Sequence, residues 1–413
     1  MLVVVSDTVV GGAAVACRRL VKELEPRLPD SLQWISAMMD KDDVAEIMPQ
    51  STKMIEFLLA HFGGRWKTRV RLLKNYREWQ VARRFAAEVR NSVPDIINIH
   101  NIHEVTGFSF LMKLPSSVHL VWTLHNMWPL TGYCCCSFEC TKFRSGCKGE
   151  CPQDGQWGVM PTQTAALGWE KRQAILNRLQ GRLSFVAPSR WLSDLSRIRF
   201  STQLSVTTIP NGINLQVFRP IEDRNALRRN LGLPLDRSII LAGAHVANDY
   251  LKGNHFVINA VEKLQRHYGM NVLVVAFGNI QANTNIPGGW LFTGCIRDER
   301  LLNLYYNVAD VFVHPSLADN LPNTLIEATA AGTPSVTFDI GGCPEVVRHR
   351  QTGYVAKYKD ADDLINGIRW ILEMPENNIL HIRKVCREVA EKEYDVRLMA
   401  QRYIALFEKV LSN

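Results

Sequence analysis

The sequence predicts an α/β protein with two domains, each built on a parallel sheet. The chain has 413 residues, too many for one ordinary hydrophobic core, and a hydrophobic content of 46% is enough for two. Short apolar segments alternate with helix-like segments along both halves, and this order is typical of parallel sheets. Turn signals and a closing proline mark residues 209–220 as the connection between the halves.

We therefore expect a first domain over residues 1–208, a linker over 209–220 and a second domain over 221–394. The closing stretch, residues 395–413, has the pattern of an amphipathic helix. The first half is predicted to contain strands at 2–6, 95–100, 118–124 and 183–188, with a helix at 12–25. The second half is predicted to contain strands at 238–243, 271–277, 310–314 and 334–338, with a helix at 255–268.

The most informative segment is Asp319-Asn-Leu-Pro-Asn-Thr-Leu-Ile-Glu327, which comes after the predicted strand 310–314. Pro322 suits the first turn of a helix, where its missing N–H costs nothing. Gly332, with a proline two positions later, supplies the stop. The segment therefore predicts a loop followed by a helix.

Two carboxylates, Asp319 and Glu327, lie eight positions apart around this helix start. The helical part of their separation spans about 8 Å, similar to the distance between the ribose of a nucleotide and a sugar beyond its phosphates. A sugar nucleotide is the expected ligand. The alternative is that Asp319 caps the helix and Glu327 is a solvated helix residue.

This segment resembles the E-x7-E signature of the family 4 glycosyltransferases, with Asp319 in place of the first Glu. The resemblance implies a retaining enzyme of GT-B fold, with two facing Rossmann-like domains and a final helix that crosses back to the first domain. It also implies that Glu327 holds the ribose hydroxyls and that Asp319 contacts the transferred sugar. Asn320 and Leu321 are assigned with them to donor binding. Asp is shorter than Glu, so the identity of the donor sugar stays open.

Two further loops match the family. Gly11 and Gly12 follow the first strand and precede a helix, which lets backbone N–H groups face a ligand, although a simple turn is the alternative. In the loop after the first strand of the second domain, Gly243 comes first and Lys252 lies beside a helix start. A cation at a helix N-terminus favours a diphosphate. Many family members add an Arg where this chain has Ala244.

The segment Ile340-Gly-Gly-Cys-Pro-Glu-Val-Val347 resembles the Gly-Gly-x-Pro-Glu element of the family. Gly341 and Gly342 are predicted to let the donor approach closely, and Glu345 is predicted to hydrogen-bond to it. A turn with no other role is the alternative.

His125 follows the strand 118–124, at the carboxyl end where doubly wound sheets bind ligands. It matches the active-site His of the family's first domain, which contacts the transferred sugar. His100, Asn101 and His103 end the preceding strand and are predicted to contact the acceptor. A structural histidine is the alternative for His125.

Six of the ten cysteines lie between positions 134 and 151, within a predicted insertion at 132–153. In a reducing compartment such a cluster argues for metal rather than disulfides. The predicted ligands of a structural zinc are Cys134, Cys140, Cys147 and Cys151, with Cys135 or Cys136 as substitutes for the first. A reduced, metal-free loop is the alternative. The insertion resembles one in transferases of the colanic acid type.

The net charge of +8 is concentrated in residues 65–90, which hold nine Lys or Arg residues interleaved with aromatic and aliphatic ones. This pattern fits a helix on an anionic membrane surface and equally a solvated helix with an apolar stripe. No recognised nucleic-acid module accompanies it, so nucleic acid is not the expected partner. No apolar run of eighteen residues and no leader segment is evident, and we expect a cytoplasmic protein, at most at the inner face of the membrane.

The sequence therefore predicts a glycosyltransferase that moves a sugar from a nucleoside diphosphate sugar to a hydroxyl of a lipid-linked saccharide. No Asp-x-Asp motif lies where a bridging metal would be needed, so no cofactor is expected for catalysis. Two alternatives remain: an epimerase or phosphorylase on the same fold, and a non-enzymatic zinc-containing module that recruits a membrane complex.

Overall fold

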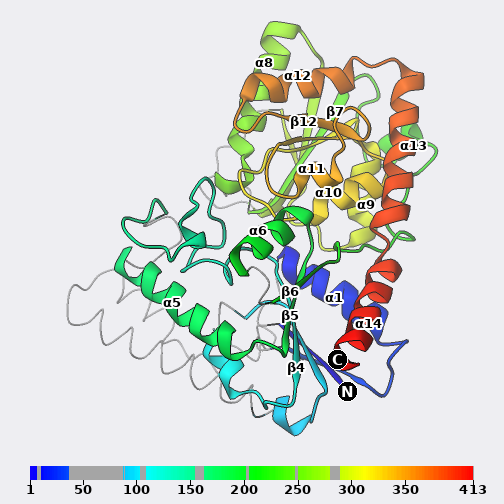
Figure 1. Cartoon of the computed structure of the whole chain (residues 1–413). Helices are drawn as coiled ribbons and strands as arrows, with labels where there is room; N and C mark the ends of the chain where they lie inside the picture. The colour runs from blue at the N-terminus through cyan, green and yellow to red at the C-terminus, as the bar shows by residue number, and fades with distance from the viewer. Residues whose placement is uncertain are drawn as a thin grey trace, which may run out of the picture. The chain divides into compact units, whose positions relative to one another are not determined.

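The structure, a computed structural model, divides into two compact units. It describes residues 1–6, 11–36, 87, 89–102, 108–153, 162–200, 204–246, 250–279 and 289–412. The first unit spans residues 1–187, 193–207 and 403–413, and the second spans 188–192 and 208–402. The chain thus enters the second unit before residue 209 and ends in the first (Figure 1).

Six strands of the described residues form the sheet of the first unit, in the order β2-β1-β3-β4-β5-β6. The neighbours from β2 to β5 in this order are paired in parallel. The strands are β1 (Leu2–Ser6), β2 (Leu32–Ser36), β3 (Ile96–Ile99), β4 (His119–Thr123), β5 (Leu183–Ala187) and β6 (Ser205–Thr208). The strand order reverses between β1 and β3, which makes their carboxyl ends the expected ligand position.

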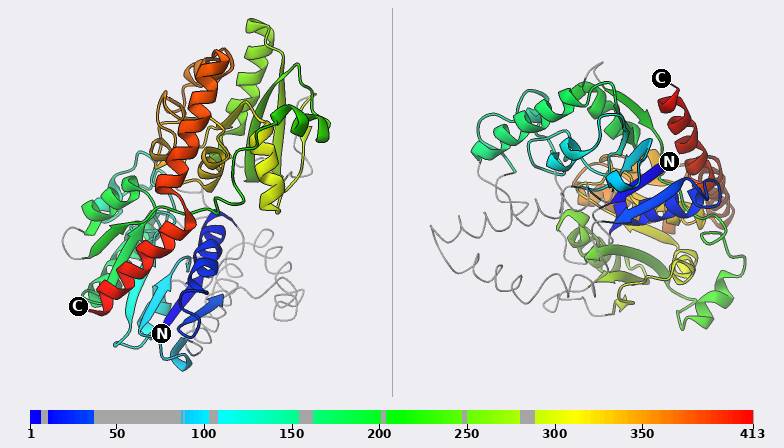
Figure 2. Two further views of the ribbon diagram at one scale, coloured as in Figure 1. Left: turned by 90° about the vertical axis from the view of Figure 1, so that its right-hand side faces the viewer. Right: turned by 90° about the horizontal axis from the view of Figure 1, so that it is seen from below.

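Helices pack against this sheet because its strands are apolar on both faces. Both β1 and β3 are fully buried along their length. The helices of the unit are α1 (Gly12–Leu24), α5 (Thr162–Arg178) and α6 (Arg190–Phe200), with 3₁₀ turns η1 (Phe108–Lys113) and η2 (Lys142–Arg144). Figure 2 shows α14 (Val396–Leu411) in red, ending at the C-terminus, and residues 403–411 of this helix belong to the first unit. The sequence analysis assigned residues 395–413 to the first domain, whereas in the structure the chain returns to the first unit at residue 403.

The second unit contains another six-stranded parallel sheet within the described ranges, ordered β12-β11-β10-β7-β8-β9. The strands are β7 (Ser238–Val246), β8 (Val272–Asn279), β9 (Leu291–Phe292), β10 (Val311–His314), β11 (Ser335–Phe338) and β12 (Gly353–Ala356). The order reverses between β7 and β10. Their carboxyl ends therefore carry the expected ligand position of this unit.

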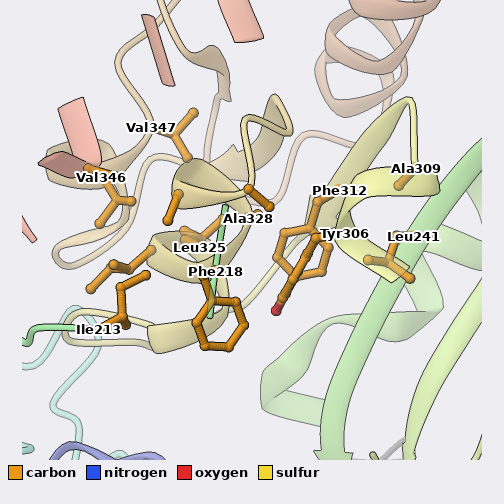
Figure 3. Packing of buried hydrophobic residues seen from close by; sticks show 14 of the residues in the cluster. Ile213, Phe218, Leu241, Tyr306, Ala309, Phe312, Leu325, Ala328, Val346 and Val347 are labelled. Carbon is orange, nitrogen blue, oxygen red and sulfur yellow. The ribbon is translucent and has the colours of Figure 1, made fainter. Parts of the chain in front are cut away.

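Alternate residues of these strands enter two separate hydrophobic clusters, because successive strand side chains point to opposite faces. Leu241 and Phe312 belong to one cluster, and Ile240 and Val313 to the other. Figure 3 shows the first cluster, in which the ring of Tyr306 meets that of Phe312 edge to face. The helices of the unit are α7 (Arg224–Asn230), α8 (Asn254–Tyr268), α9 (Glu299–Val308), α10 (Asn323–Ala330), α11 (Cys343–Val346), α12 (Ala361–Leu372) and α13 (Glu376–Glu393), with the 3₁₀ turn η3 (Tyr250–Lys252).

Pro322 lies just before helix α10, whereas the sequence analysis placed it in the first turn of that helix. Pro322 is the N-cap, with extended backbone angles, and Asn323 is the first helical residue. Gly332 ends the helix as predicted, with φ of +74°, while the Thr333 N–H bonds the Ala328 carbonyl.

The prediction of two parallel α/β sheets is confirmed, and the predicted strands 2–6 and 310–314 agree with β1 and β10 to within a residue. The sequence analysis missed four strands, which are β2, β6, β9 and β12. All of them are short strands at or next to the sheet edges, where pairing with a neighbour matters more than local pattern.

Candidate functional site

Lys252, which is predicted to bind the diphosphate, and Asp319, which is predicted to bind the transferred sugar, lie in contact in the second unit. The Lys252 ammonium lies 2.8 Å from Oδ2 of Asp319, and Nε2 of His314 donates to the same oxygen at 3.2 Å. The Asp319 side chain is 16% exposed and that of Lys252 29%. Lys252 follows β7, whereas His314 ends β10 and Asp319 follows it, and these two strands lie on either side of the order reversal.

A close approach of two loops brings these side chains together. Gly253, with φ of +70°, caps the start of α8, and a Cβ there would lie 1.9 Å from the Pro315 carbonyl oxygen. The Leu251 carbonyl accepts bonds from the Leu317 N–H and the Ser316 hydroxyl. Only glycine satisfies both the left-handed angle and the contact. This glycine thus holds the loop that carries Lys252 against the loop that leads to Asp319.

Asp319 is an anion over the whole physiological range. Burial alone would raise the pKa of its carboxyl, but the Lys252 charge, together with His314, lowers that pKa far below its usual value. The helix-cap alternative is wrong, because Pro322 caps α10 and Asp319 lies outside the helix.

Glu327 lies inside α10 and is buried, with 4% of its surface exposed, so the solvated alternative is also wrong. The hydroxyl of Tyr306, from α9, donates to its Oε2 at 3.0 Å. Tyr306 is itself fully buried in the cluster of Figure 3. A buried hydrogen bond of this kind fixes the rotamer of the carboxylate, which is what ribose recognition needs.

The glycine segment after β11 packs on the loop that carries Asp319. A Cβ at Gly341, whose φ is +57°, would lie 1.8 Å from the Asp319 carbonyl oxygen, and one at Gly342 would lie 2.0 Å from that of Asn320. Glycine is thus required at both positions because the backbone of residues 341–342 lies against the backbone of residues 319–320. Contact of these glycines with a donor stays a prediction.

Glu345 accepts hydrogen bonds from residues 188–192, a short segment that belongs to the second unit. Its two carboxylate oxygens accept bonds from the backbone N–H groups of Arg190 and Trp191, at 2.9 and 2.8 Å. In the same stretch, the Ser189 hydroxyl lies 2.5 Å from Oδ1 of Asn320. These contacts give Glu345 a structural role that the sequence analysis did not foresee. Its bond to a donor stays a prediction.

Gly243 and Leu321 serve the core of the second unit. A Cβ at Gly243 would overlap the ring of Phe277, 2.1 Å away, so the glycine makes room for that ring. Leu321 is 5% exposed and belongs to the cluster around Tyr306. Donor contact of either residue stays a prediction.

In the first unit, His125 lies just beyond β4 and is hydrogen-bonded to His100, which follows β3. Nδ1 of His100 and Nε2 of His125 are 2.9 Å apart, and Nε2 of His100 lies 3.0 Å from Oδ1 of Asn98. Both histidines and Asn101 line one small hollow. Burial, followed by the His125 charge, lowers the pKa of His100 well below its ordinary value.

Gly11 caps α1 with φ of +93° and ψ of 174°, angles that glycine adopts without strain, and Gly12 is the first helical residue. A Cβ at Gly11 would meet nothing within 4 Å. The conformation, rather than crowding, requires glycine here. His103 and nearly all of the basic segment 65–90 lie outside the described residues.

The four predicted zinc ligands Cys134, Cys140, Cys147 and Cys151 line a single hollow. Burial raises the pKa of the Cys134 thiol to about 12, and Sγ of Cys147 accepts the Gly132 N–H at 3.3 Å. In the part of the chain that the structure describes, no group of three or more His, Cys, Asp or Glu residues is arranged to hold a metal ion. The chemistry of the donor set fits zinc, and the site stays a prediction.

Two arginines fix the segment that precedes the cysteine insertion to helices α5 and α6. Arg172 of α5 donates to the Trp128 and Thr131 carbonyls at 2.7 and 2.6 Å, and its guanidinium lies over the Trp128 ring. Arg199 of α6 donates to the Leu130 carbonyl at 3.1 Å. These bonds hold the segment between His125 and the first cysteine.

Four residues in or next to the two clusters around Asp319 and His125 were not predicted from the sequence. They are Asn98, His314, Tyr306 and Tyr403, and the hydroxyl of Tyr403 lies 2.8 Å from Oγ1 of Thr123 at the end of β4. Asn98 is a polar residue inside the apolar strand Ile96-Ile-Asn-Ile99, which is an informative signal. His314 ends an apolar strand in the same way. The two tyrosines lie on helices, where a buried hydroxyl has no sequence pattern.

Across the described helices, none is both long and apolar enough to cross a membrane.

Two family descriptions match the chain. Residues 10–217 match glycosyltransferase family 4, and residues 223–393 match the glycosyl transferases group 1. The two matches cover the first half of the chain and most of the second.

Two curated relatives share part of the sequence. The N,N'-diacetylbacillosaminyl-diphospho-undecaprenol alpha-1,3-N-acetylgalactosaminyltransferase of Campylobacter jejuni is 36% identical over 104 residues, 25% of this chain and 27% of that protein. The putative colanic acid biosynthesis glycosyl transferase WcaC of Escherichia coli is 26% identical over 268 residues, 63% of each chain. The matched regions therefore span less than two thirds of either relative.

The fold is that of a solved structure, Anabaena HepE in complex with UDP and glucose, with a TM-score of 0.66 at 15% identity over 99% of both chains. With the family match over residues 10–217, which is half of the chain, these findings place the protein: the chain belongs to glycosyltransferase family 4.

Proposed function

We propose that this protein is a retaining glycosyltransferase that moves a sugar from a nucleoside diphosphate sugar to a hydroxyl of a saccharide. The observation that carries the proposal is the bond between Lys252 and Asp319 at the order reversal of the second sheet. The Lys252 ammonium and the Asp319 carboxylate therefore lie side by side. In a sugar nucleotide, a phosphate that would bind the ammonium lies next to a sugar that would bind the carboxylate.

The donor would lie across the carboxyl ends of β7 and β10. Lys252 and the backbone N–H groups at the start of α8 would bind the diphosphate and stabilise the charge that develops on it as it leaves. These groups supply the positive charge that a bridging metal would supply, so the proposed reaction needs no metal. Glu327 would accept bonds from the ribose hydroxyls, and Asp319 from a hydroxyl of the transferred sugar.

In the first unit, His125 would contact the transferred sugar, and His100 and Asn101 the acceptor. Retention would follow if the leaving phosphate takes the proton of the acceptor hydroxyl as the new bond forms on the same face of the sugar. The HepE structure, solved with UDP and glucose, supports a nucleoside diphosphate sugar as donor.

The acceptor is proposed to be lipid-linked, for synthesis of a cell-surface polysaccharide. One relative is named for a diphospho-undecaprenol acceptor and the other for colanic acid biosynthesis. Both names support a substrate at the inner face of the cell membrane. The basic segment 65–90 would bind that anionic surface, and the cysteine insertion would hold a structural zinc.

The first test is the thermal midpoint of the full chain with a panel of UDP-, GDP- and ADP-sugars, because a ligand that binds the native state raises the midpoint. A selective rise that is lost in Glu327→Ala identifies the donor. Glu388→Ala, which removes an exposed helix carboxylate paired with Lys384, is the matched control and should keep the rise.

Measurement of the reaction products then distinguishes a transferase from an epimerase, a phosphorylase and a non-enzymatic module. Release of nucleoside diphosphate that depends on a saccharide acceptor supports the proposal. Conversion of the donor sugar without an acceptor indicates an epimerase, and consumption of phosphate with a saccharide indicates a phosphorylase. A chain that binds no sugar nucleotide but retains zinc and membrane binding is the non-enzymatic module.

A further inference from the structure

A series of connected hydrogen bonds in the first unit starts at the buried Asn98 of β3. Its Nδ2 lies 3.0 Å from the Val121 carbonyl oxygen and 3.3 Å from Oγ1 of Thr123. A carbonyl oxygen only accepts, so this contact requires the amide nitrogen on that side. The amide oxygen Oδ1 of Asn98 is therefore the atom that faces His100.

The orientation of Asn98 determines which nitrogen of His100 carries the proton. Nε2 of His100 lies 3.0 Å from Oδ1 of Asn98, an acceptor, so Nε2 bears the hydrogen. His100 is 3% exposed, and this burial holds its pKa well below the ordinary value, so the ring is neutral. A neutral ring protonated at Nε2 has an unprotonated Nδ1. His100 thus accepts a hydrogen bond through Nδ1.

The next bond in the chain transmits this constraint to His125. Nδ1 of His100 lies 2.9 Å from Nε2 of His125, and an accepting Nδ1 needs a donor opposite. Nε2 of His125 must carry the hydrogen.

We propose that Asn98 and His100 are positioning residues that hold His125 in the Nε2–H tautomer, so that His125 accepts a hydrogen bond or a proton at Nδ1. This inference rests on the proposed function only for the use of that nitrogen. In a transferase, Nδ1 of His125 would accept a bond from a hydroxyl of the transferred sugar and would discriminate against a sugar that lacks a donor there.

The final helix closes the same network. Oγ1 of Thr123 lies 2.8 Å from the hydroxyl of Tyr403, which is 2% exposed and belongs to the first unit. The Tyr403 ring stacks near that of His100, with centroids 6.4 Å apart. Tyr403 thus contacts both Thr123 and His100, and Asn98 between them is fully buried.

The test is the tautomer itself, measured on the full chain with nitrogen-15-labelled histidine by two-bond proton–nitrogen correlation at neutral pH. We expect a protonated Nε2 and an unprotonated Nδ1 for His125. His119, at the other end of β4, is the internal reference. An Nδ1–H tautomer of His125 in the wild type overturns the proposal.

Asn98→Asp tests whether the residue at position 98 determines the tautomer of His125 through His100. A carboxylate at position 98 stabilises the protonated form of His100, whose Nδ1 then donates, so the two nitrogen signals of His125 should exchange. Thr123→Val is the matched control, because it keeps the bond between Asn98 and Val121, and its His125 signals should stay unchanged. The same spectrum shows whether both nitrogens of His100 carry a proton in Asn98→Asp, and an Nε2–H tautomer of His125 beside a doubly protonated His100 contradicts the proposal. If His100 stays neutral, the proposal requires an unchanged His125, and an exchange of the His125 signals contradicts it.

If Asn98→Asp does not fold, the wild-type tautomer alone decides. The measurement needs no substrate, so the predicted tautomer in a chain that turns over no sugar nucleotide would uphold this inference and reject the proposed function.

Discussion

Lys252 Nζ lies 2.8 Å from Oδ2 of Asp319, across 67 positions of sequence. The bond joins the residue predicted to bind diphosphate to the residue predicted to bind sugar. When a phosphate draws the Lys252 ammonium away, the Asp319 carboxylate keeps His314 as a donor and can accept one further hydrogen bond. A sugar hydroxyl next to the phosphate supplies that bond, whereas a nucleoside diphosphate without the sugar does not.

Lys252→Ala is expected to lower kcat/KM by about 100-fold or more, because it removes a charge that faces the leaving diphosphate. Folding should survive, since His314 still donates to Asp319. Steady-state release of nucleoside diphosphate gives the rate, and the thermal midpoint reports folding.

Lys263→Ala is the matched control for this change. Lys263 forms a similar 2.7 Å ion pair with Asp362 on the surface, where such pairs contribute little. Equal activities of the two variants would remove Lys252 from the mechanism.

The Asp319 carboxylate should stabilise the fold in a pH-dependent way. Its pKa is lower in the folded protein than in the unfolded chain, so its stabilising contribution is present above the unfolded pKa of about 4 and is lost as pH falls below it. The difference in unfolding free energy between wild type and Asp319→Asn should be constant from pH 8 to about 5. It should shrink as pH falls below about 4, measured by urea unfolding. A difference that grows in acid would contradict the assignment.

Tyr306→Phe is expected to lower the unfolding free energy by about 1–3 kcal/mol, because the buried Glu327 carboxylate loses a hydrogen-bond donor. It should also weaken donor binding, because the carboxylate is then less well oriented for the ribose. Urea unfolding and the donor-dependent thermal shift measure the two effects.

Tyr305→Phe, at the neighbouring and less buried position, controls for the loss of a hydroxyl on the same helix. It should leave both quantities near those of wild type. Full donor affinity in Tyr306→Phe would mean that Glu327 needs no orientation by its neighbour.

Purified full-length protein is expected to contain about one zinc per chain, held by the cysteines that line one hollow. Cys147→Ser should release it, because the change removes one of the four predicted thiolate ligands. Metal analysis by mass spectrometry gives the stoichiometry. Cys295→Ser, an exposed cysteine in the second unit, is the control. A metal-free, fully reduced wild type would leave the insertion as a simple loop.

Much of the fold could be predicted because the central strands are apolar on both faces and end at turn residues. β1 and β10 show this, whereas β12 is a four-residue edge strand that depends on pairing with β11. The site was predictable only where a motif marks it. Lys252 and Asp319 lie in motifs, but the contact of Thr123 with Tyr403 spans 280 positions, and no local pattern indicates such a pair.

Gly342→Ala is expected to lower the unfolding free energy by about 1–3 kcal/mol and to abolish the donor-dependent thermal shift. Its new Cβ would lie 2.0 Å from the Asn320 carbonyl oxygen and 2.8 Å from Cβ of Ser189, so backbone must move. The segment that moves is the one that carries Asp319, which ties stability to binding.

Gly232→Ala separates this effect from the ordinary cost of replacing glycine. Gly232 has φ of +67° and open space around its Cβ position, so its substitution strains only the local backbone, by about 1 kcal/mol. It should keep the thermal shift with the donor. Loss of stability with full donor binding in Gly342→Ala would show that the loop of Asp319 tolerates displacement, and would argue against a precise role for that carboxylate.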